Sequence, residues 1–197
     1  MPSLTALILG AGSNVGQSLA TLLKQKGYAV ALGSRNPDFD HVKKEGFFPV
    51  RIDVSKPESI KDAFATVNAE LGPPNVVVYN GNSSILLNRP GLIFIHKLTA
   101  AVFKAPPDPT DPLSLPLEDF TEAVFTGLGV FVAAQQALPG FRSETHKDST
   151  KTFIVTGNIL PFVPPTSPLF LGLDTQKYIQ ARLVDLFSRV YPKEDIR

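Results

Sequence analysis

The chain has 197 residues, the size of one ordinary globular domain. Hydrophobic residues make up 43% and charged residues 19%, a balance that can build a core and excludes general disorder. The net charge of +1 provides no broad electrostatic surface for nucleic acid or anionic membranes. Cysteine is absent, which excludes disulfides, thiol nucleophiles and thiolate metal sites.

The N-terminal region lacks the features of a targeting sequence. Its apolar run, Leu4–Leu9, has no basic segment before it and no cleavage site after it, so we interpret the run as a strand. We expect no apolar stretch long enough to span a bilayer. These features predict a soluble, cytoplasmic protein without membrane or nucleic-acid partners.

Apolar runs alternate with segments of helical periodicity along the chain. The runs Val76–Val78 and Phe153–Val155 are apolar throughout, which is typical of strands buried on both faces. The alternation predicts an α/β fold, a Rossmann-type, doubly wound parallel sheet of about five strands, in a single domain over residues 1–197. The expected strands are 5–9, 28–33, 47–52, 75–79 and 152–156, and the expected helices are 14–26, 57–70, 117–138 and 175–190.

Two proline-rich connections interrupt this alternation, at residues 82–116 and 157–172. Both follow the carboxyl ends of predicted strands, where open α/β sheets bind ligands. The first is longer than an ordinary connection in a compact domain, and such lengths are typical of functional or disordered segments. Two interpretations stay open for residues 83–104: a lid over the site, or an in-frame intron retained in the gene model.

Three glycines, Gly10, Gly12 and Gly16, stand between the first predicted strand and the first predicted helix. A glycine turn in this position lets backbone N–H groups approach a phosphate, and the helix N-terminus favours the negative charge. The motif in this context therefore predicts a nucleotide site. The alternative is a structural turn without a ligand.

The end of the second predicted strand bears on which nucleotide is bound. An acidic residue there would bind a ribose 2′-hydroxyl, whereas arginine favours a 2′-phosphate. The sequence has Ser34 and Arg35 at this point and no acidic residue. Because a serine hydroxyl and an arginine can both bind a phosphate, the sequence predicts NADP(H) as the cofactor. The alternative for Arg35 is a solvated loop residue.

The turn from Gly10 to Gly16 resembles that of the short-chain dehydrogenase/reductase family, which usually reads Gly-x-x-x-Gly-x-Gly. Asn14 replaces the middle glycine, and Asn tolerates a positive φ better than most residues. The resemblance continues at Asp53-Val54, a pair that the family places against the adenine. The alternative for Asp53 is a turn or N-cap residue.

Asn80-Gly81 resembles part of the family's Asn-Asn-Ala-Gly segment, with Tyr79 in place of the first Asn. The cofactor-binding residues implied by the motif and the resemblance are Gly10, Gly12, Ser13, Asn14, Val15, Gly16, Ser34, Arg35, Asp53, Val54, Asn80, Gly81 and Lys177.

The resemblance implies a chemistry that normally uses Ser, Tyr and Lys with a supporting Asn. The tyrosine protonates the carbonyl oxygen, and the lysine four residues later lowers its pKa and holds the nicotinamide ribose. Lys177 is present here, but Leu173 stands four residues before it. Tyr178 is turned about 100° away around the helix. The expected proton donor is therefore absent from the sequence.

Two further positions depart from the family pattern. Asn158 stands where the serine is expected, and Thr126 where the supporting Asn is expected. The segments 156–158 and Pro106–Pro112 resemble an atypical fungal-type branch of the superfamily. The catalytic residues implied are Lys177 and Asn158, which would polarise the carbonyl oxygen while water or a substrate group replaces the tyrosine.

The resemblance implies an NADP(H)-dependent oxidoreductase that acts on a small-molecule carbonyl or alcohol. Two alternatives stay open: a nucleotide-binding pseudoenzyme, and a non-redox lyase or cyclase. Phe120, Phe125 and Phe131 on the long helix are typical of core or oligomer packing, and we expect that a homo-oligomer could form there. Family members continue beyond the position of Arg197, so the chain is C-terminally short relative to the family and we expect an exposed sheet edge.

The remaining polar candidates favour structural roles. The histidines of the chain are His41, His96 and His146. They share no metal-ligand spacing and are expected to be solvated, so no metal site is predicted. Asp108 and Asp111 could place a carboxylate near a substrate, but Asp beside Pro is typical of turns. Asp174 is interpreted as a cap of the last helix rather than a base.

Overall fold

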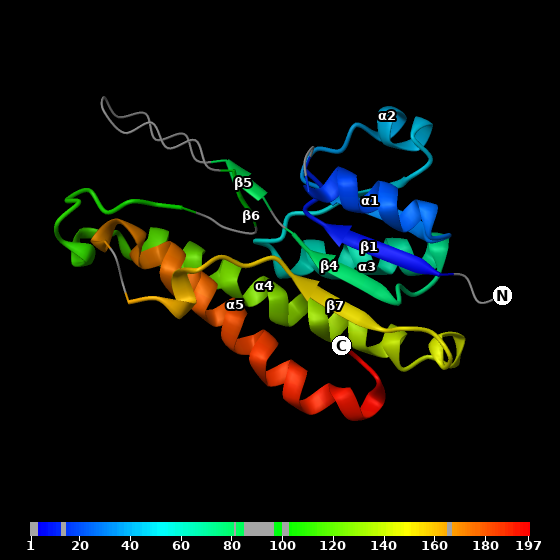
Figure 1. The fold of residues 1–197 in the computed structure, drawn as a ribbon. Coiled ribbons are helices and arrows are strands. Elements are labelled where there is room, and N and C mark those ends of the chain that lie inside the picture. Colours follow the sequence, from blue (N-terminus) through cyan, green and yellow to red (C-terminus); the bar gives the residue numbers. More distant parts are fainter. Residues whose placement is uncertain (1–3, 13–14, 81, 85–96, 100–102, 165–166) are drawn as a thin grey trace.

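A computed structural model of the chain describes residues 4–12, 15–80, 82–84, 97–99, 103–164 and 167–197. Within these residues, five parallel strands form one sheet in the order β3-β2-β1-β4-β7 (Figure 1). The strands are β1 (Thr5–Leu9), β2 (Ala29–Ser34), β3 (Phe48–Arg51), β4 (Val76–Tyr79) and β7 (Thr152–Val155). The main helices are α1 (Val15–Gln25), α2 (Phe39–Lys44), α3 (Pro57–Leu71), α4 (Leu117–Phe141) and α5 (Leu171–Val190). The predicted Rossmann-type sheet is confirmed.

Helices cover both faces of the sheet. Helices α1 and α2 lie on one face, α3 and α4 lie on the other, and α5 packs against α4 (Figure 1). Alternate strand residues separate two cores: Leu7 and Leu9 belong to the core under α3 and α4, whereas Ala6 and Ile8 belong to the core under α1. All four side chains are fully buried, as expected for a central strand of a parallel sheet.

Two helices differ from their predicted bounds by three or more residues. Helix α4 continues through Pro139 to Phe141 instead of ending at residue 138. A proline in the last turn removes one N–H donor, but the turn continues because the N–H of Arg142 donates to the carbonyl of Leu138 at 3.1 Å. Helix α5 begins at Leu171 instead of residue 175, which brings Leu173 into the helix.

The structure also contains elements that were not predicted. Helix α2 has no buried residue, so it carries no apolar periodicity in the sequence. It begins where the side chain of Asp38 accepts a hydrogen bond from the backbone N–H of His41 at 3.0 Å. In the long connection, β5 (Asn82–Ser84) and β6 (Lys97–Thr99) pair antiparallel. Residues 85–96 and 100–102, most of the segment considered as a lid, lie outside the described residues.

The last residues of the chain cover part of the sheet edge. Ile196 forms a parallel bridge with Lys151, and the N–H of Phe153 donates to the carbonyl of Arg197 at 2.7 Å. The expectation of an exposed edge is therefore wrong at the start of β7, because the chain turns back after α5 and pairs there (Figure 1). Farther along β7, the side chain of Ile154 is 43% exposed, so the expectation that Phe153–Val155 is buried on both faces is wrong for this edge strand.

Helix α4 is long and apolar enough to cross a membrane, judged by length and composition alone over the described residues. The expectation that no stretch reaches this length is therefore wrong. In the structure, the buried residues Ala123, Val130 and Ala133 of α4 pack inward, and the helix contacts α3, α5 and β4. The core helix of a globular protein also meets these criteria of length and composition, so α4 is only weak evidence for a membrane span.

Candidate functional site

Four neighbouring strands end side by side at one edge of the sheet. Ser34 ends β2, while Gly10, Asn80 and Thr156 follow β1, β4 and β7. The backbone N–H groups of Gly10, Asn80 and Thr156 each donate to a carbonyl of the neighbouring strand, at 2.6–3.1 Å. The order of connection reverses at β1, which lies between β2 and β4. Such a reversal is where open α/β sheets bind ligands.

The glycine turn has two positions that require glycine. Gly10 has a φ of +89°, a region that favours glycine, and its N–H and that of Ala11 both donate to the carbonyl of Gly33 at 2.8 Å. Gly16 is buried at the start of α1, and a Cβ there would lie 2.8 Å from the Cα of Ala11. Helix α1 therefore starts directly against the turn, with its free N–H groups near the end of β1.

The other predicted residues of the turn are described only in part. Ser13 and Asn14 lie outside the described residues, as does Gly81 after β4. The carbonyl of Gly12 accepts the N–H of Gln17 at 3.1 Å, which supports the first turn of α1. The side chain of Val15 is 58% exposed. The cofactor contacts of these residues stay predictions.

Asn80 connects the end of β4 to the glycine turn. Its side chain is buried, and its Nδ2 donates to the carbonyl of Gly10 at 3.0 Å. Its Oδ1 is also buried and has no hydrogen-bond partner among the described residues. A buried oxygen without a partner costs about 1–3 kcal/mol, which a ligand donor or a water molecule would recover. This oxygen therefore fits a site that takes a polar ligand.

Asp53 forms a turn after β3. Its Oδ1 accepts hydrogen bonds from the N–H and the hydroxyl of Ser55, at 3.1 and 2.7 Å. The N-cap of α3 is Lys56, so Asp53 has the turn role rather than the cap role. Val54 packs against the core under α3 and α4. The adenine contact that the resemblance implies for Asp53 and Val54 stays a prediction.

The end of β2 carries Ser34, which is half-buried, and Arg35, which is exposed. Sequence reasoning missed a third polar residue there. Arg51 ends β3 opposite Ser34 in the register, and its Nε donates to the carbonyl of Arg35 at 3.2 Å. The signal was a charged residue inside an otherwise apolar run, residues 47–52. The exposure of Arg35 fits both phosphate binding and the solvated alternative.

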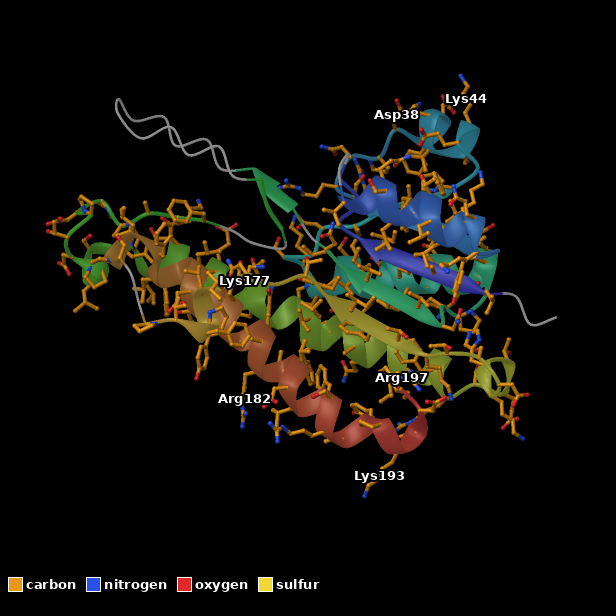
Figure 2. All side chains as sticks on the ribbon, in the orientation of Figure 1. Asp38, Lys44, Lys177, Arg182, Lys193 and Arg197 are labelled. Carbon is orange, nitrogen blue, oxygen red and sulfur yellow. The ribbon has the colours of Figure 1, made fainter. Side chains whose placement is uncertain are left out.

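Lys177 lies inside the molecule, whereas Arg182 on α5 and Lys193, which follows α5, point outward (Figure 2). Because α5 begins at Leu171, Leu173 and Lys177 occupy one helical face, and each is 2% exposed. The Nζ of Lys177 donates to the Oε1 of Gln180 at 3.1 Å. A buried aliphatic side chain thus stands where the resemblance implies a tyrosine.

A cavity of about 350 Å³ brings Lys177 and Asn158 together. Its walls come from the end of β7, the connection after it and the inner face of α5. The lining residues are Val155, Gly157, Asn158, Pro161, Phe162, Lys177, Gln180, Ala181, Val184 and Asp185. The Oδ1 of Asn158 accepts the N–H of Leu160 at 3.1 Å, which orients its amide. Apolar walls with a few polar groups suit a small organic ligand.

Two titratable groups line this cavity. Burial lowers the pKa of Lys177 to about 8, because desolvation disfavours the ammonium form. The amine is then still mostly protonated near pH 7, yet it releases its proton more readily than an ordinary lysine. Hydrogen bonding from Arg189, aided by the charge of Arg182, holds the pKa of Asp185 below its usual value. Lys177 is therefore the acid of this pair at neutral pH.

The tyrosines near the site do not line the cavity. Tyr178 is 60% exposed on the outer side of α5, as predicted. Tyr79 is fully buried, and its hydroxyl lies 3.5 Å from the carbonyl of Thr126. Burial, and then the charge of Asp53, raises the pKa of Tyr79 well above its usual range. The hydroxyl of Thr126 donates to the carbonyl of Glu122 at 2.8 Å. Neither tyrosine therefore replaces the expected acid.

His146 contradicts the expectation of a solvated side chain. It is fully buried, and its Nε2 lies 2.6 Å from the carbonyl oxygen of Pro73, which accepts the hydrogen bond. The contact joins the loop after α4 to the loop before β4. His41 is exposed, 3.6 Å from a carboxylate oxygen of Glu45, and His96 lies outside the described residues. The described part of the chain contains no group of three or more His, Asp or Glu side chains that could hold a metal ion.

The aspartates considered earlier have local roles. The Oδ1 of Asp108 accepts the N–H of Thr110 at 2.8 Å, and that of Asp111 accepts the N–H of Leu113 at 2.9 Å. Both are therefore turn-forming residues. Asp174 lies in the first turn of α5, whose N-cap is Phe170, so the expected capping role of Asp174 is wrong.

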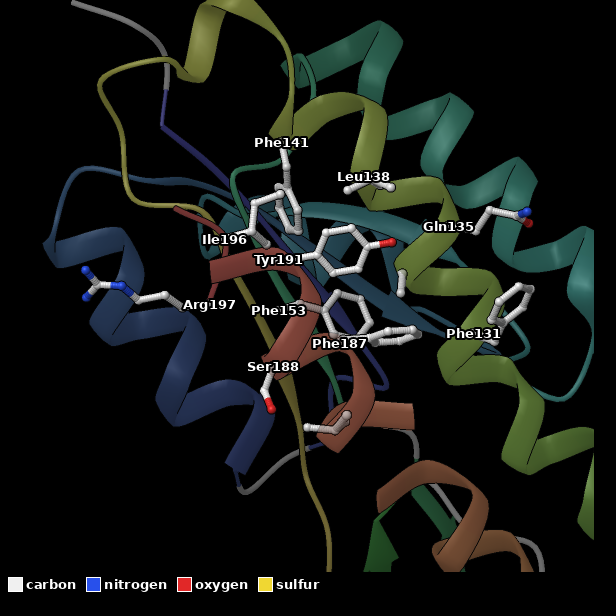
Figure 3. Close-up of a pocket in the computed structure, with 12 residues that line it drawn as sticks. Phe131, Gln135, Leu138, Phe141, Phe153, Phe187, Ser188, Tyr191, Ile196 and Arg197 are labelled. Carbon is white, nitrogen blue, oxygen red and sulfur yellow. The ribbon is translucent and has the colours of Figure 1, made fainter. Parts of the chain in front are cut away.

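A second cavity, of about 280 Å³, contains none of the predicted site residues (Figure 3). It lies between α4, α5 and the last residues of the chain. Its walls are largely aromatic and include Phe131, Phe141, Phe153, Phe187 and Tyr191. These side chains offer apolar packing rather than acid–base chemistry.

Known proteins resemble this chain in both sequence and fold. The family model for short chain dehydrogenase matches residues 4–98. A short chain dehydrogenase/reductase, dmxR12 of Cryptosporiopsis sp. (strain 8999), is 35% identical over 173 residues, which cover 87% of this chain and 65% of that protein. The chain thus spans slightly less than two thirds of the length of this relative.

Solved structures share the fold. An alcohol dehydrogenase from the archaeon Thermococcus sibiricus, complexed with 5-hydroxy-NADP, is 25% identical with a TM-score of 0.70, over 99% of this chain and 73% of that one. A gluconate 5-dehydrogenase from Burkholderia cenocepacia J2315, in complex with NADP and tartrate, is 18% identical with a TM-score of 0.71, over 100% of this chain and 69% of that one. The sheet order, the glycine turn and these matches make the chain similar to short-chain dehydrogenases/reductases in sequence and in fold.

Proposed function

We propose that the chain binds NADP(H) through a single Rossmann domain and catalyses oxidoreduction of a small-molecule carbonyl or alcohol. The observation that carries the proposal is the arrangement at the carboxyl edge of the sheet. The glycine turn follows β1, and the cavity with the buried Lys177 opens at the end of β7. A nucleotide site and a polar group for chemistry thus share one edge.

Several residues would hold the cofactor. The N–H groups at the start of α1, where the glycine turn meets the helix, would bind the pyrophosphate, and Ser34 and Arg35 would bind the 2′-phosphate. The unpartnered Oδ1 of Asn80 would accept a hydrogen bond from the bound molecule. Support comes from the Thermococcus sibiricus alcohol dehydrogenase, whose structure contains 5-hydroxy-NADP. When bound, NADPH supplies a hydride to the carbonyl carbon.

The chain's own residues would orient the substrate oxygen and manage its proton. The amine of Lys177 would either bind a ribose hydroxyl of the cofactor or help to supply the proton that the substrate oxygen takes up. The amide of Asn158 would donate a hydrogen bond to the same substrate oxygen. A water molecule or a substrate group would complete the proton transfer in place of the tyrosine. General acid–base catalysis typically raises a rate by about 10²–10⁴-fold, and without a dedicated acid a large part of this factor would be missing.

Leu173 favours a second candidate function. Because this side chain is buried on the same face as Lys177, the position for an acid is filled by a hydrocarbon. A protein of this kind could bind the nucleotide without using it, as a pseudoenzyme. It could also use the cavity to shape a substrate for a non-redox lyase or cyclase reaction.

A fluorescence titration of the folded protein with NADPH and NADH tests the proposal. We expect NADPH to bind more tightly, and Arg35→Ala to remove most of the preference. Consumption of NADPH with a panel of small carbonyl compounds, lost in Lys177→Ala, identifies redox activity. Binding without consumption identifies the pseudoenzyme, and substrate turnover without consumption identifies the lyase or cyclase. Absence of NADPH binding overturns the proposal.

We also propose that two copies associate through the outer face of α4. Phe125 and Leu128 are exposed there, at 54% and 39%, and Phe131, at the rim of the second cavity, is 46% exposed. A stripe of large apolar side chains on one helix is typical of a protein–protein interface.

A further inference from the structure

Arg51 occupies a position from which it acts on the loop after β2. It ends β3 directly opposite Ser34, so the two residues lie at the same level of the sheet edge. Its Nε donates to the carbonyl of Arg35 at 3.2 Å, and its Nη2 lies 3.5 Å from the Oδ1 of Asn36. One guanidinium thus bridges to two consecutive residues of the loop. Among the described residues these contacts engage only Nε and Nη2, which leaves the Nη1 edge to meet an anion.

The charges around this loop favour an anion. Arg35 and Arg51 are both exposed, and no acidic residue lies at the end of β2. Asp38, where the loop meets α2, is engaged as the N-cap, with its side chain accepting the N–H of His41. The nearest acidic side chain after β3, Asp53, is turned to Ser55 and Lys56. Arg35 follows Ser34 in the chain and Arg51 lies opposite Ser34 in the sheet register, so this edge carries two guanidinium groups and a hydroxyl, donors that suit a phosphate monoester.

We propose that Arg51 determines selectivity for the 2′-phosphate of NADP(H) by positioning the Arg35–Asn36 loop and adding a second positive charge beside it. The inference rests on the proposed function and deepens it. Arg35 would contact the phosphate directly, whereas Arg51 acts mainly through the backbone of Arg35. A nucleotide without the 2′-phosphate gains nothing from either arginine, so both should act on NADPH and spare NADH.

The test measures dissociation constants for NADPH and NADH by fluorescence titration, with the full chain at two salt concentrations. We expect Arg51→Ala to weaken NADPH binding by about 2- to 5-fold, the upper part of the range for exposed charge pairs. NADH binding should change less than about 2-fold, and added salt should reduce the effect. Arg51→Lys keeps the charge but loses the bridging geometry, and we expect an intermediate loss.

Two comparisons separate selectivity from a structural role. Lys61→Ala removes one exposed positive charge on α3. It should leave the preference for NADPH over NADH, measured by the two dissociation constants, unchanged. In the double variant of Arg35 and Arg51, the losses should be less than additive, because Arg51 acts through Arg35. A thermal unfolding curve for each variant shows whether a loss comes from misfolding, which would weaken both nucleotides alike.

The outcomes are distinct. The quantity compared is the preference for NADPH, the dissociation constant for NADH divided by that for NADPH. If Arg51→Ala leaves this preference as in the wild type while Arg35→Ala lowers it, the inference is wrong and the proposed function stands. If the wild type binds the two nucleotides equally, selectivity is absent and the inference is overturned. If the wild type binds neither, the proposed function fails and this inference fails with it.

Discussion

The buried amine of Lys177 should make the stability of the protein depend on pH in a specific direction. In the unfolded chain Lys177 keeps its proton up to its ordinary pKa of 10.5, whereas burial lowers the pKa in the folded protein to about 8. Between these values the unfolded state binds more protons than the folded state, so the free energy of unfolding rises with pH. Below about pH 8 the Lys177 amine is protonated in both the folded and the unfolded protein, and the folded protein carries the full free-energy cost of burying the charge.

The size of the effect follows from the shift. One pKa unit corresponds to about 1.4 kcal/mol, so the shift of Lys177 amounts to about 3 kcal/mol in total. Integrated over pH, about 2 kcal/mol of this is regained between pH 7 and pH 9.5. Lys177→Met keeps the length and apolar stem of the side chain and removes the charge. The free energy of unfolding of the wild type should therefore rise by about 2 kcal/mol relative to this variant over that interval.

Urea denaturation at about pH 7 and about pH 9.5, followed by circular dichroism, measures this difference. The comparison with Lys177→Met cancels the other titrating groups, including Tyr79. Lys61→Met, on the exposed side of α3, serves as the control and should show no such change. If the difference between wild type and Lys177→Met changes by less than about 0.5 kcal/mol, the amine does not carry the desolvation that its burial implies.

Three further predictions follow from individual contacts. Gly129→Ala should lower the free energy of unfolding by about 1–3 kcal/mol, because a Cβ there would overlap the hydroxyl of Tyr79 and lie 2.6 Å from the carbonyl oxygen of Val54; Tyr79→Phe removes the first overlap and should restore part of this loss in urea denaturation. His146→Ala should cost about 2–4 kcal/mol in the same assay, since it empties a buried site and leaves the Pro73 carbonyl without its donor; a loss below about 0.5 kcal/mol would contradict the buried contact. Phe131→Glu should shift the protein toward monomer in light scattering, and an unchanged mass would argue against association through α4.

Much of the frame could be predicted because its signals are local. The apolar runs at Thr5–Leu9 and Val76–Tyr79 predicted central strands, and both are fully buried. The glycines at positions 10 and 16 predicted a turn between a strand and a helix, and each is required there by φ or by close packing. These features depend on the backbone preferences of a few adjacent residues, so they are visible in the sequence.

Other features had weak or misleading local signals. Helix α2 buries none of its residues, so no periodicity marked it. Pro139 suggested the end of α4, but a proline near the last turn removes only one donor and the helix continues to Phe141. His146 has a polar, loop-like neighbourhood in the sequence, and its burial depends on Pro73, a residue far away in the chain.

The sequence by itself determined the parallel α/β frame, the glycine turn and the absence of a tyrosine four residues before Lys177, because each is a matter of residue type and spacing. Only the tertiary structure decided that Lys177 and Asn158 share a cavity, that Arg51 holds the carbonyl of Arg35, and that Leu173 is buried beside Lys177. The physical reason is that burial and hydrogen bonding between distant residues depend on how strands and helices pack. A cavity and a lowered pKa arise from that packing and from no local pattern.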